Sequence, residues 1–195
     1  MGHRWSDVLK SHLAETSSLQ NLVAMQCGPS MERAIQAIAA SLRRGGKLMT
    51  CGSGASAADC QRIVTELTGR VTKEFKRPAI ASVALTTDTS FLTAYANDSG
   101  FEGVFERQVE ALGKRGDVLL GISTSGESAD VRRAFHLARK MGITTIALVG
   151  EGGPLSSKAD FAIIIPSSLT SHIQEAMLPI EHVICHAVER EMFPD

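Results

Sequence analysis

Residues 116–128, GDVLLGISTSGES, join a run of apolar side chains to a turn of small polar ones. The apolar run is short and nearly continuous, which is typical of a strand that is buried on both faces of a parallel sheet. The turn leads into ADVRRAF, which is interpreted as the beginning of a helix. This succession of strand, turn and helix predicts one unit of an α/β fold.

The same pattern recurs on both sides of this segment. Four further apolar runs predict strands, at residues 47–52, 80–85, 144–150 and 161–166. Helical patterns separate or follow them, at residues 56–67, 89–96, 101–112, 128–141 and 171–192, and residues 151–160 are interpreted as a loop. Because parallel strands are joined by right-handed crossovers, we expect a three-layer, doubly wound parallel sheet of about five strands.

Two helices are predicted ahead of the sheet, over residues 6–26 and 29–44. The first has an apolar stripe that a single sheet domain does not need to bury, which indicates a role in oligomerisation. No internal repeat or linker divides the chain. We therefore expect a single domain over 1–195, in which 1–44 are helices used in oligomerisation and 45–195 form the α/β core.

Composition excludes several classes of protein. The 195 residues are 44% hydrophobic and 21% charged, with a formal net charge of −1, so no bulk field favours a nucleic acid or a membrane as partner. The first residues lack a signal-peptide core and no apolar run is long enough to span a bilayer, so a cytoplasmic location is expected. The four scattered cysteines are interpreted as buried apolar residues in a reducing compartment.

Polar donors follow two of the predicted strands, at the edge where parallel α/β sheets bind ligands. Hydroxyls and free backbone amides at a helix N-terminus favour an anion such as a phosphate monoester. Neither turn has the spacing of a nucleotide-binding loop, so a phosphosugar is the predicted ligand; the alternative is two ordinary serine caps. The donors are Ser123, Thr124, Ser125 and Ser128 after one strand, and Ser53 and Ser56, with Gly52 and Gly54, after another.

Acid and base candidates lie on two helices. Glu66 is about two turns into the helix that follows residue 54, with Arg62 one turn before it, and His182 follows Gln174 by eight residues on the last helix. The alternatives are an exposed carboxylate, a histidine with a structural partner and a glutamine on a helix surface.

Four segments together resemble the phosphoheptose isomerases of the sugar isomerase (SIS) fold. They are GSGASAADCQRIVTELTGR, ALTTDTSFLTAYANDSGFE, GDVLLGISTSGES and IQEAMLPIEHVICHAVE, and the resemblance covers nearly the whole chain in order. It implies an aldose–ketose isomerase that converts sedoheptulose 7-phosphate to D-glycero-D-manno-heptose 7-phosphate through an enediolate. The product would supply heptose biosynthesis for lipopolysaccharide or a related glycan.

The resemblance also implies roles for individual residues. Glu66 and His182 would be the catalytic base and proton donor, and Gln174 would hold the substrate. Further substrate contacts are implied at Ser53, Gly54, Ala55, Ser56, Glu66, Arg70, Asn97, Asp98, Ser123, Thr124, Ser125 and Ser128.

The chain departs from the family at a metal ligand. Family members carry GNGGSAADAQH where this chain has GSGASAADCQR, so Arg62 stands in place of a zinc-binding histidine. The implied ligands Glu66, Gln174 and His182 would hold zinc only weakly, because a guanidinium stays protonated and repels the ion. One hypothesis is that no metal is needed and Arg62 replaces its charge; the other is that Arg62 only pairs with Glu66 on the helix.

Two other functions remain open at the sequence level. One is a non-catalytic SIS binding module like the DnaA initiator-associating protein, whose LFP ending the C-terminal MFPD resembles. The other is an isomerase of a related phosphosugar. The partners implied by the resemblance are a phosphorylated sugar and further copies of the chain in a homotetramer. The composition predicts neither nucleic acid nor membrane as a partner.

Overall fold

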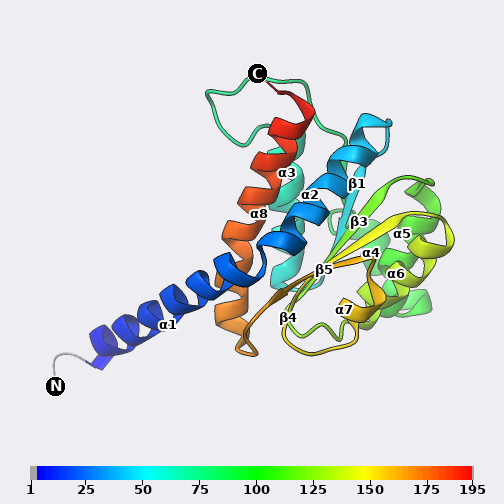
Figure 1. Cartoon of the computed structure of the whole chain (residues 1–195). Coiled ribbons are helices and arrows are strands. Elements are labelled where there is room, and N and C mark those ends of the chain that lie inside the picture. The colour runs from blue at the N-terminus through cyan, green and yellow to red at the C-terminus, as the bar shows by residue number, and fades with distance from the viewer. Residues whose placement is uncertain (1–3, 195) are drawn as a thin grey trace.

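A computed structural model describes residues 4–194 as an α/β domain around one parallel sheet (Figure 1). Its five strands lie in the order β2-β1-β3-β4-β5 and all pair in parallel. They are β1 (Leu48–Cys51), β2 (Ser82–Ala84), β3 (Val118–Ser123), β4 (Thr144–Gly150) and β5 (Phe161–Ile165). The predicted doubly wound sheet is confirmed, with all five strands inside the predicted runs.

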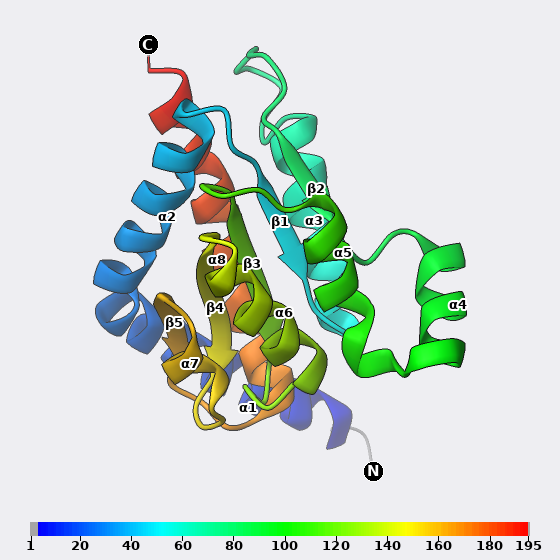
Figure 2. The same ribbon diagram turned by 90° about the vertical axis from the view of Figure 1, so that its right-hand side faces the viewer.

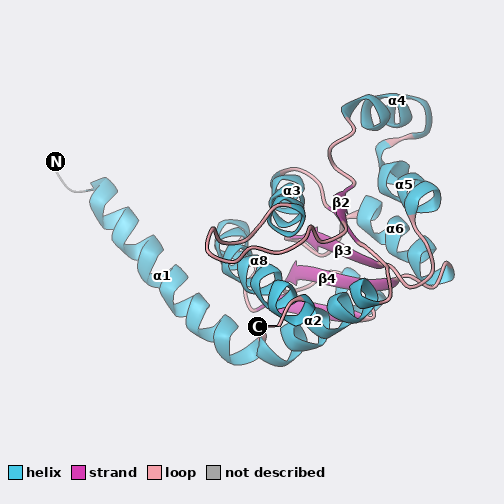
Figure 3. Cartoon of the chain, turned by 90° about the horizontal axis from the view of Figure 1, so that it is seen from above, coloured by secondary structure: helices cyan, strands magenta, loops and turns pink. Residues whose placement is uncertain are grey.

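Helices cover both faces of the sheet, as Figures 2 and 3 show. One face carries α2 (Gly28–Arg43), α3 (Ala55–Thr68) and α8 (Thr170–Met192). The other carries α4 (Thr89–Ser99), α5 (Val104–Leu112), α6 (Ala129–Lys140) and α7 (Leu155–Lys158), with a 3₁₀ turn over Phe101–Gly103. The interpretation of residues 151–160 as loop was wrong at α7, which forms because Leu155 is fully buried against the sheet.

Two apolar clusters, one on each face, hold the layers together. Ile38, Ile63 and Leu120 belong to the cluster beneath α2, α3 and α8, whereas Phe105 and Phe135 belong to the cluster beneath α5 and α6. A β-carbon at Gly121 would come within 2.7 Å of the Phe135 ring and 2.5 Å of Val131 Cγ1. The missing side chain in β3 therefore lets α6 pack closely against the sheet and fixes where the N-terminus of α6 lies.

The first helix, α1 (Arg4–Gln26), extends away from the domain (Figure 3). Only two of its described residues, Leu19 and Val23, are buried, whereas Trp5, Leu9 and Leu13 expose more than half of their surface. This is the unburied apolar stripe expected from the sequence. Its use in oligomerisation stays a prediction.

Glu175 on α8 makes three polar contacts with the inner part of α1, beside those of His172 with His12 and Glu15. His12 Nε2 and Thr16 Oγ1 each lie 2.6 Å from a carboxylate oxygen of Glu175, and Gln20 Nε2 donates to its backbone carbonyl at 3.3 Å. That carbonyl lacks its normal helical donor because residue 179 is a proline, which has no N–H. The glutamine of α1 therefore supplies the hydrogen bond that Pro179 removes from α8.

Within residues 4–194, no helix combines the length and the hydropathy needed to cross a bilayer. The four cysteines are buried and free, as predicted. Burial raises the pKa of each thiol, and that of Cys60 to about 12, so these side chains stay protonated at neutral pH.

Candidate active site

The turn between β3 and α6, residues 123–128, is called the serine turn below. Ser123 Oγ and Ser128 Oγ lie 2.7 Å apart, and Ser123 Oγ also accepts from the backbone N–H of Gly126 at 3.2 Å. Ser128 is the N-cap of α6 but its side chain makes no capping bond. In the first turn of α6 the N–H of Val131 donates to Asp130 Oδ1 at 2.9 Å, so only the amides before it are left without a side-chain cap for an anion.

Backbone contacts brace the serine turn from the loop after β4. Gly150 donates to the carbonyl of Thr124 at 3.2 Å, and Leu155 donates to that of Gly126 at 3.0 Å. Gly126 and Gly153 both have a φ of +67°, and a β-carbon on Gly153 would lie 2.4 Å from the carbonyl carbon of Gly126. Glycine is needed here because the two loops touch backbone to backbone.

A second turn, residues 52–56 between β1 and α3, lies beside the serine turn and is called the glycine turn. Ser53 Oγ donates to the buried carboxylate of Asp130 in α6, which ties the two turns together. Gly54, with a φ of +63°, is the N-cap of α3 and has no side chain with which to cap the helix. Ser56 is buried. Two adjacent helices thus begin at one edge of the sheet with uncapped amides.

The second part of the site lies between α3 and α8. Glu66 Oε1 on α3 is 2.8 Å from His182 Nδ1 on α8. The glutamate side chain is 14% exposed and the imidazole 49%, so a largely buried carboxylate contacts a more accessible ring. This pairing of a carboxylate with an imidazole can remove and return a proton.

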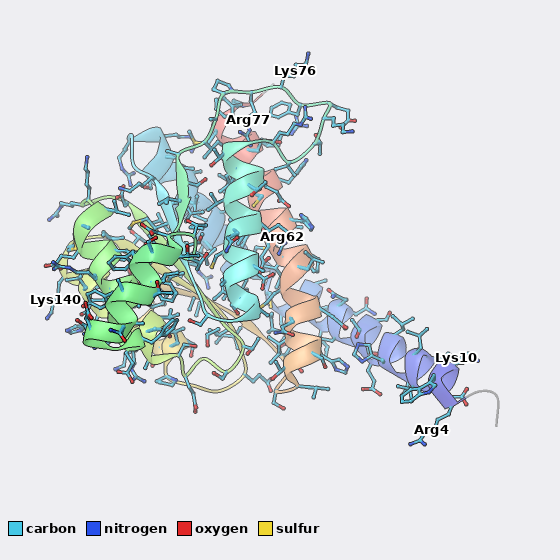
Figure 4. The ribbon with its side chains drawn as sticks, turned by 180° about the vertical axis from the view of Figure 1, so that it is seen from behind. Arg4, Lys10, Arg62, Lys76, Arg77 and Lys140 are labelled. Carbon is cyan, nitrogen blue, oxygen red and sulfur yellow. The ribbon has the colours of Figure 1, made fainter. Side chains whose placement is uncertain are left out.

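Arg62 lies between the same two helices, as Figure 4 shows. Its Nη2 contacts Glu181 Oε2 on α8 and lies 3.3 Å from Asp59 Oδ1 on α3, whereas its Nη1 lies 3.9 Å from Glu66 Oε1. The predicted Arg62–Glu66 pair is thus present but long, and the main partner of Arg62 is Glu181. We call Asp59, Arg62, Glu66, Glu181 and His182 the charged cluster.

Four buried atoms of the charged cluster have no hydrogen-bond partner among residues 4–194. They are Arg62 Nη1, Glu66 Oε2 and both carboxylate oxygens of Glu181, of which Oε2 contacts Arg62 Nη2 as an ion pair. A buried donor or acceptor without a partner destabilises a protein by about 1–3 kcal/mol. A donor and acceptors left unsatisfied within one cluster are what a polar ligand would complete.

Burial also acts on groups around the cluster. The pKa of Asp59 is raised by burial, an effect that the Arg62 guanidinium opposes. The pKa of the Cys185 thiol is raised above its usual range by burial and then by the charge of Glu66. The thiol beside Glu66 therefore stays neutral, and Cys185 is no nucleophile of this site.

Comparison with known proteins shows the family of the chain. A model of the SIS domain matches residues 12–150. The phosphoheptose isomerase of Citrifermentans bemidjiense is 46% identical over 186 residues, which are 95% of this chain and 94% of that protein. The chain belongs to the phosphoheptose isomerase family.

Solved structures of this family agree with the fold. The phosphoheptose isomerase GmhA from Neisseria gonorrhoeae superposes with a TM-score of 0.88 at 37% identity, covering 94% of this chain and 98% of that one. A phosphoheptose isomerase from Francisella tularensis gives a TM-score of 0.90 at 32% identity, with 94% and 97% covered.

The structure does not gather every predicted residue of a phosphoheptose isomerase site within one chain. Gln174 is on α8, but eight residues of helix separate it from His182 by about 12 Å. Arg70 is exposed just beyond the end of α3. Asn97 and Asp98 are exposed on α4, which packs on α5 and the 3₁₀ turn, on the opposite face of the sheet from α8 (Figure 2).

The resemblance to zinc-binding family members implies an ion held at positions 62, 66, 174 and 182. The residues present do not fit it. The Arg62 guanidinium lies at Glu66, and Glu66 Oε1 is already bonded to His182. In the described part of the chain, no three His, Cys, Asp or Glu side chains are grouped so that they could hold a metal.

Sequence reasoning missed Glu181, whose side chain is fully buried. One signal was available, since Glu181 follows Gln174 by seven residues and so shares its helix face more closely than His182 does. A carboxylate within the apolar run LPIEHVI needs a partner. That the partner is Arg62 depends on α3 lying beside α8, which no spacing in the sequence reveals.

A second buried ion pair, also missed, supports the same helices. Arg77 Nε lies 2.8 Å from Glu189 Oε2, and the two side chains are 1% and 0% exposed. Arg77 also donates to the carbonyls of Glu66, Leu67 and Gly69 at 2.8, 2.7 and 3.1 Å. It thus satisfies the C-terminal carbonyls of α3 and joins the last turn of that helix, which carries Glu66, to α8.

A separate hollow of about 790 Å³ lies on the outer side of α6. It contains none of the predicted site residues. Arg133 is paired there with Glu106, and Arg139 lies 3.4 Å from Asp160. Lys140, which also lines it, is far from Arg62 in Figure 4, so this hollow is separate from the charged cluster.

Proposed function

We propose that the chain is a phosphoheptose isomerase that interconverts sedoheptulose 7-phosphate and D-glycero-D-manno-heptose 7-phosphate. The observation that carries this proposal is the 2.8 Å contact between Glu66 and His182, in a chain that belongs to the family and keeps its serine turn. Free buried cysteines agree with action in the cytoplasm, where sugar phosphates are made.

Glu66 is the base in this proposal. It takes the proton from C1 of the ketose, the electron pair of the C–H bond forms the C1=C2 double bond, and the C2 carbonyl oxygen becomes an enediolate oxygen. Returning the proton to C2 leaves the carbonyl at C1 and gives the aldose. His182 moves the proton between the two oxygens, and its bond to Glu66 orients both groups.

The serine turn binds the phosphate and the glycine turn contacts the sugar. Thr124, Ser125 and the uncapped amides of α6 face the phosphate, while Ser123 and Ser128 hold the turn in shape through their mutual bond. Gly54 and Ala55 are exposed at the start of α3 and can approach the sugar closely. This division agrees with the preference of helix N-termini for anions.

In this proposal the chain assembles as a homotetramer, and a second copy of the chain helps to complete the active site. Glu66 follows Ala55 by eleven residues, or about 16 Å along α3. The substrate is shorter than this distance. Three single bonds of an extended chain span about 3.6 Å, so the seven bonds from C2 of sedoheptulose 7-phosphate to its phosphorus span about 8 Å. A serine turn from a neighbouring chain could bind the phosphate closer to Glu66 than the turn of the same chain does. The exposed apolar stripe of α1 offers a surface for the association of chains.

Turnover of sedoheptulose 7-phosphate by the intact protein tests this function. We expect activity in the unmodified chain and a loss of about 10²- to 10⁴-fold in kcat for Glu66→Gln. In D₂O the active protein should incorporate deuterium into the sugar, and Glu66→Gln should not. Thr65→Val, a change to an exposed neighbour on α3, is the matched control. Activity of Glu66→Gln within a few-fold of the control would reject Glu66 as the base.

A further inference from the structure

We infer that Arg62 and the buried Glu181 act as one unit that takes the place of a metal ion beside Glu66. In this unit Arg62 contacts the enediolate, and Glu181 is a positioning residue that orients Arg62. The inference rests on the proposed isomerase function and adds to it a metal-free mode of stabilising the intermediate, together with a residue to which no role was predicted.

Burial of Glu181 is the first argument. Its side chain is fully inside the protein, and a buried carboxylate is strongly unfavourable unless an opposite charge accompanies it. Arg62 is the cation that contacts it, from a different helix. Glu181 therefore depends on Arg62: removing the guanidinium leaves the carboxylate as an uncompensated charge in the gap between α3 and α8, whereas removing Glu181 leaves Arg62 with Asp59 and Glu66.

The two ends of the guanidinium have different partners. Nη2 is held by Glu181 and Asp59, whereas Nη1 points to the Glu66 side at 3.9 Å from Oε1 and has no hydrogen-bond partner among the described residues. Glu66 Oε2 also has none. One nitrogen is thus used for positioning, and the other is a donor without a hydrogen bond, 3.9 Å from the Glu66 oxygen that contacts His182.

This geometry suits the charge that develops in the reaction. When Glu66 takes the C1 proton, negative charge appears on the C2 oxygen, and Arg62 Nη1 can donate a hydrogen bond to it without giving up its proton. A guanidinium fixed in advance stabilises the enediolate more than the neutral ketose, so it raises kcat rather than affinity. A divalent ion would be repelled from this place by the same charge.

Zinc binding tests the inference independently of activity. We expect protein dialysed against zinc and then washed to retain substoichiometric metal, and the double variant Arg62→His/Glu181→Leu to retain about one zinc per chain. Glu189→Gln, which removes the carboxylate from the other buried Arg–Glu pair of α8, is the matched control and should gain no zinc. One tightly bound zinc per unmodified chain would overturn the inference.

Kinetics of metal-stripped protein test the roles of the two residues. Chelation should leave turnover unchanged. Arg62→Ala should lower kcat about 10²- to 10³-fold, as for loss of an oxyanion donor, and added guanidinium should restore part of it. Glu181→Gln should lower kcat at least 10-fold with KM within about 3-fold. A structural role alone would lower the melting temperature and give no rescue by guanidinium, and that outcome would refute the proposal.

The two hypotheses fail in distinguishable ways. If the unmodified chain does not turn over sedoheptulose 7-phosphate with or without zinc, the proposed function is wrong, while the zinc-retention comparison still decides whether Arg62 and Glu181 exclude a metal. If turnover requires zinc, the isomerase function stands and the inference on Arg62 and Glu181 is wrong.

Discussion

The role assigned to Arg62 depends on contacts that only the structure shows. The sequence offered two hypotheses for it, a surface ion pair with Glu66 or a substitute for a metal, and the spacing of four residues fits both. The structure adds Glu181, a fully buried partner on another helix. Glu66 and His182 were predicted from motifs, whereas Glu181 depends on a contact between helices more than 100 positions apart in the chain.

The cysteines provide a prediction at the same scale. Burial raises the pKa of all four thiols, so none is ionised near neutral pH. In the native protein at pH 8 we expect no thiol to react with Ellman's reagent within minutes, and four to react after unfolding. Fast reaction of a native thiol would contradict the burial described here.

Linkage gives the direction of the accompanying pH effect. The folded-state pKa values lie above the unfolded ones, so between them the folded chain binds more protons than the unfolded chain. The contribution to stability is therefore complete below the ordinary thiol value of about 8.5 and is lost as the pH rises toward the folded value of about 12 for Cys60. Urea melts at pH 8 and pH 10 should show a lower free energy of unfolding at the higher pH.

At the scale of elements, one of the contacts between α1 and α8 is the hydrogen bond from Gln20 to the Glu175 carbonyl, which Pro179 leaves without a helical donor. Gln20→Leu removes the donor to that carbonyl, and we expect faster amide hydrogen exchange in residues 8–24 with little change in the sheet. Gln26→Leu, an exposed change on the same helix, is the control. Equal exchange in the two variants would mean that Gln20 does not anchor α1.

The contact of α1 with the Glu175 carboxylate should weaken at low pH. Hydrogen bonds from Thr16 and His12 lower the pKa of Glu175 below its usual value. Since the folded pKa is depressed, this contribution is present above the ordinary glutamate value of about 4.3 and is lost as the pH falls through the folded value. Exchange in α1 should therefore increase below about pH 4 relative to the sheet, after correction for intrinsic rates, and the pH at which it increases should rise in Thr16→Val.

Arg77 and Glu189 provide a test of how α3 is held. Breaking a buried ion pair by removing one partner destabilises a protein by about 3–5 kcal/mol, and Arg77 also satisfies three carbonyls at the end of α3. We expect Arg77→Ala to lower the free energy of unfolding in urea by at least about 3 kcal/mol. Arg70→Ala, at an exposed position in the same loop, should change it by less than about 0.5 kcal/mol.

At the scale of the whole molecule, apolar runs and helix periodicity were sufficient to predict the sheet, because buried strands and amphipathic helices follow from local pattern. The same patterns placed the two turns at one edge. They could not place Asn97, Asp98 or Arg70 relative to Glu66, because those positions depend on how α4 and the loop after α3 pack rather than on spacing along the sequence.

A mixing experiment tests whether two chains share a site. Glu66→Gln and a variant with Ser125→Glu in the serine turn should each be inactive alone. If one chain supplies the turn and its neighbour supplies Glu66, reassembly of an equimolar mixture should restore about a quarter of the sites by random pairing. If both parts belong to the same chain, the mixture should stay inactive. Sedimentation of the unmodified chain should give a tetramer at micromolar concentration.

The backbone contact between Gly126 and Gly153 has a consequence for binding entropy. A loop held by main-chain bonds on both sides before the ligand arrives loses little conformational freedom when it binds. Recognition of the phosphate group should then not depend on the sugar to order the loop. Free inorganic phosphate would be a competitive inhibitor in its own right, and Gly153→Ala should weaken phosphate and substrate by the same factor.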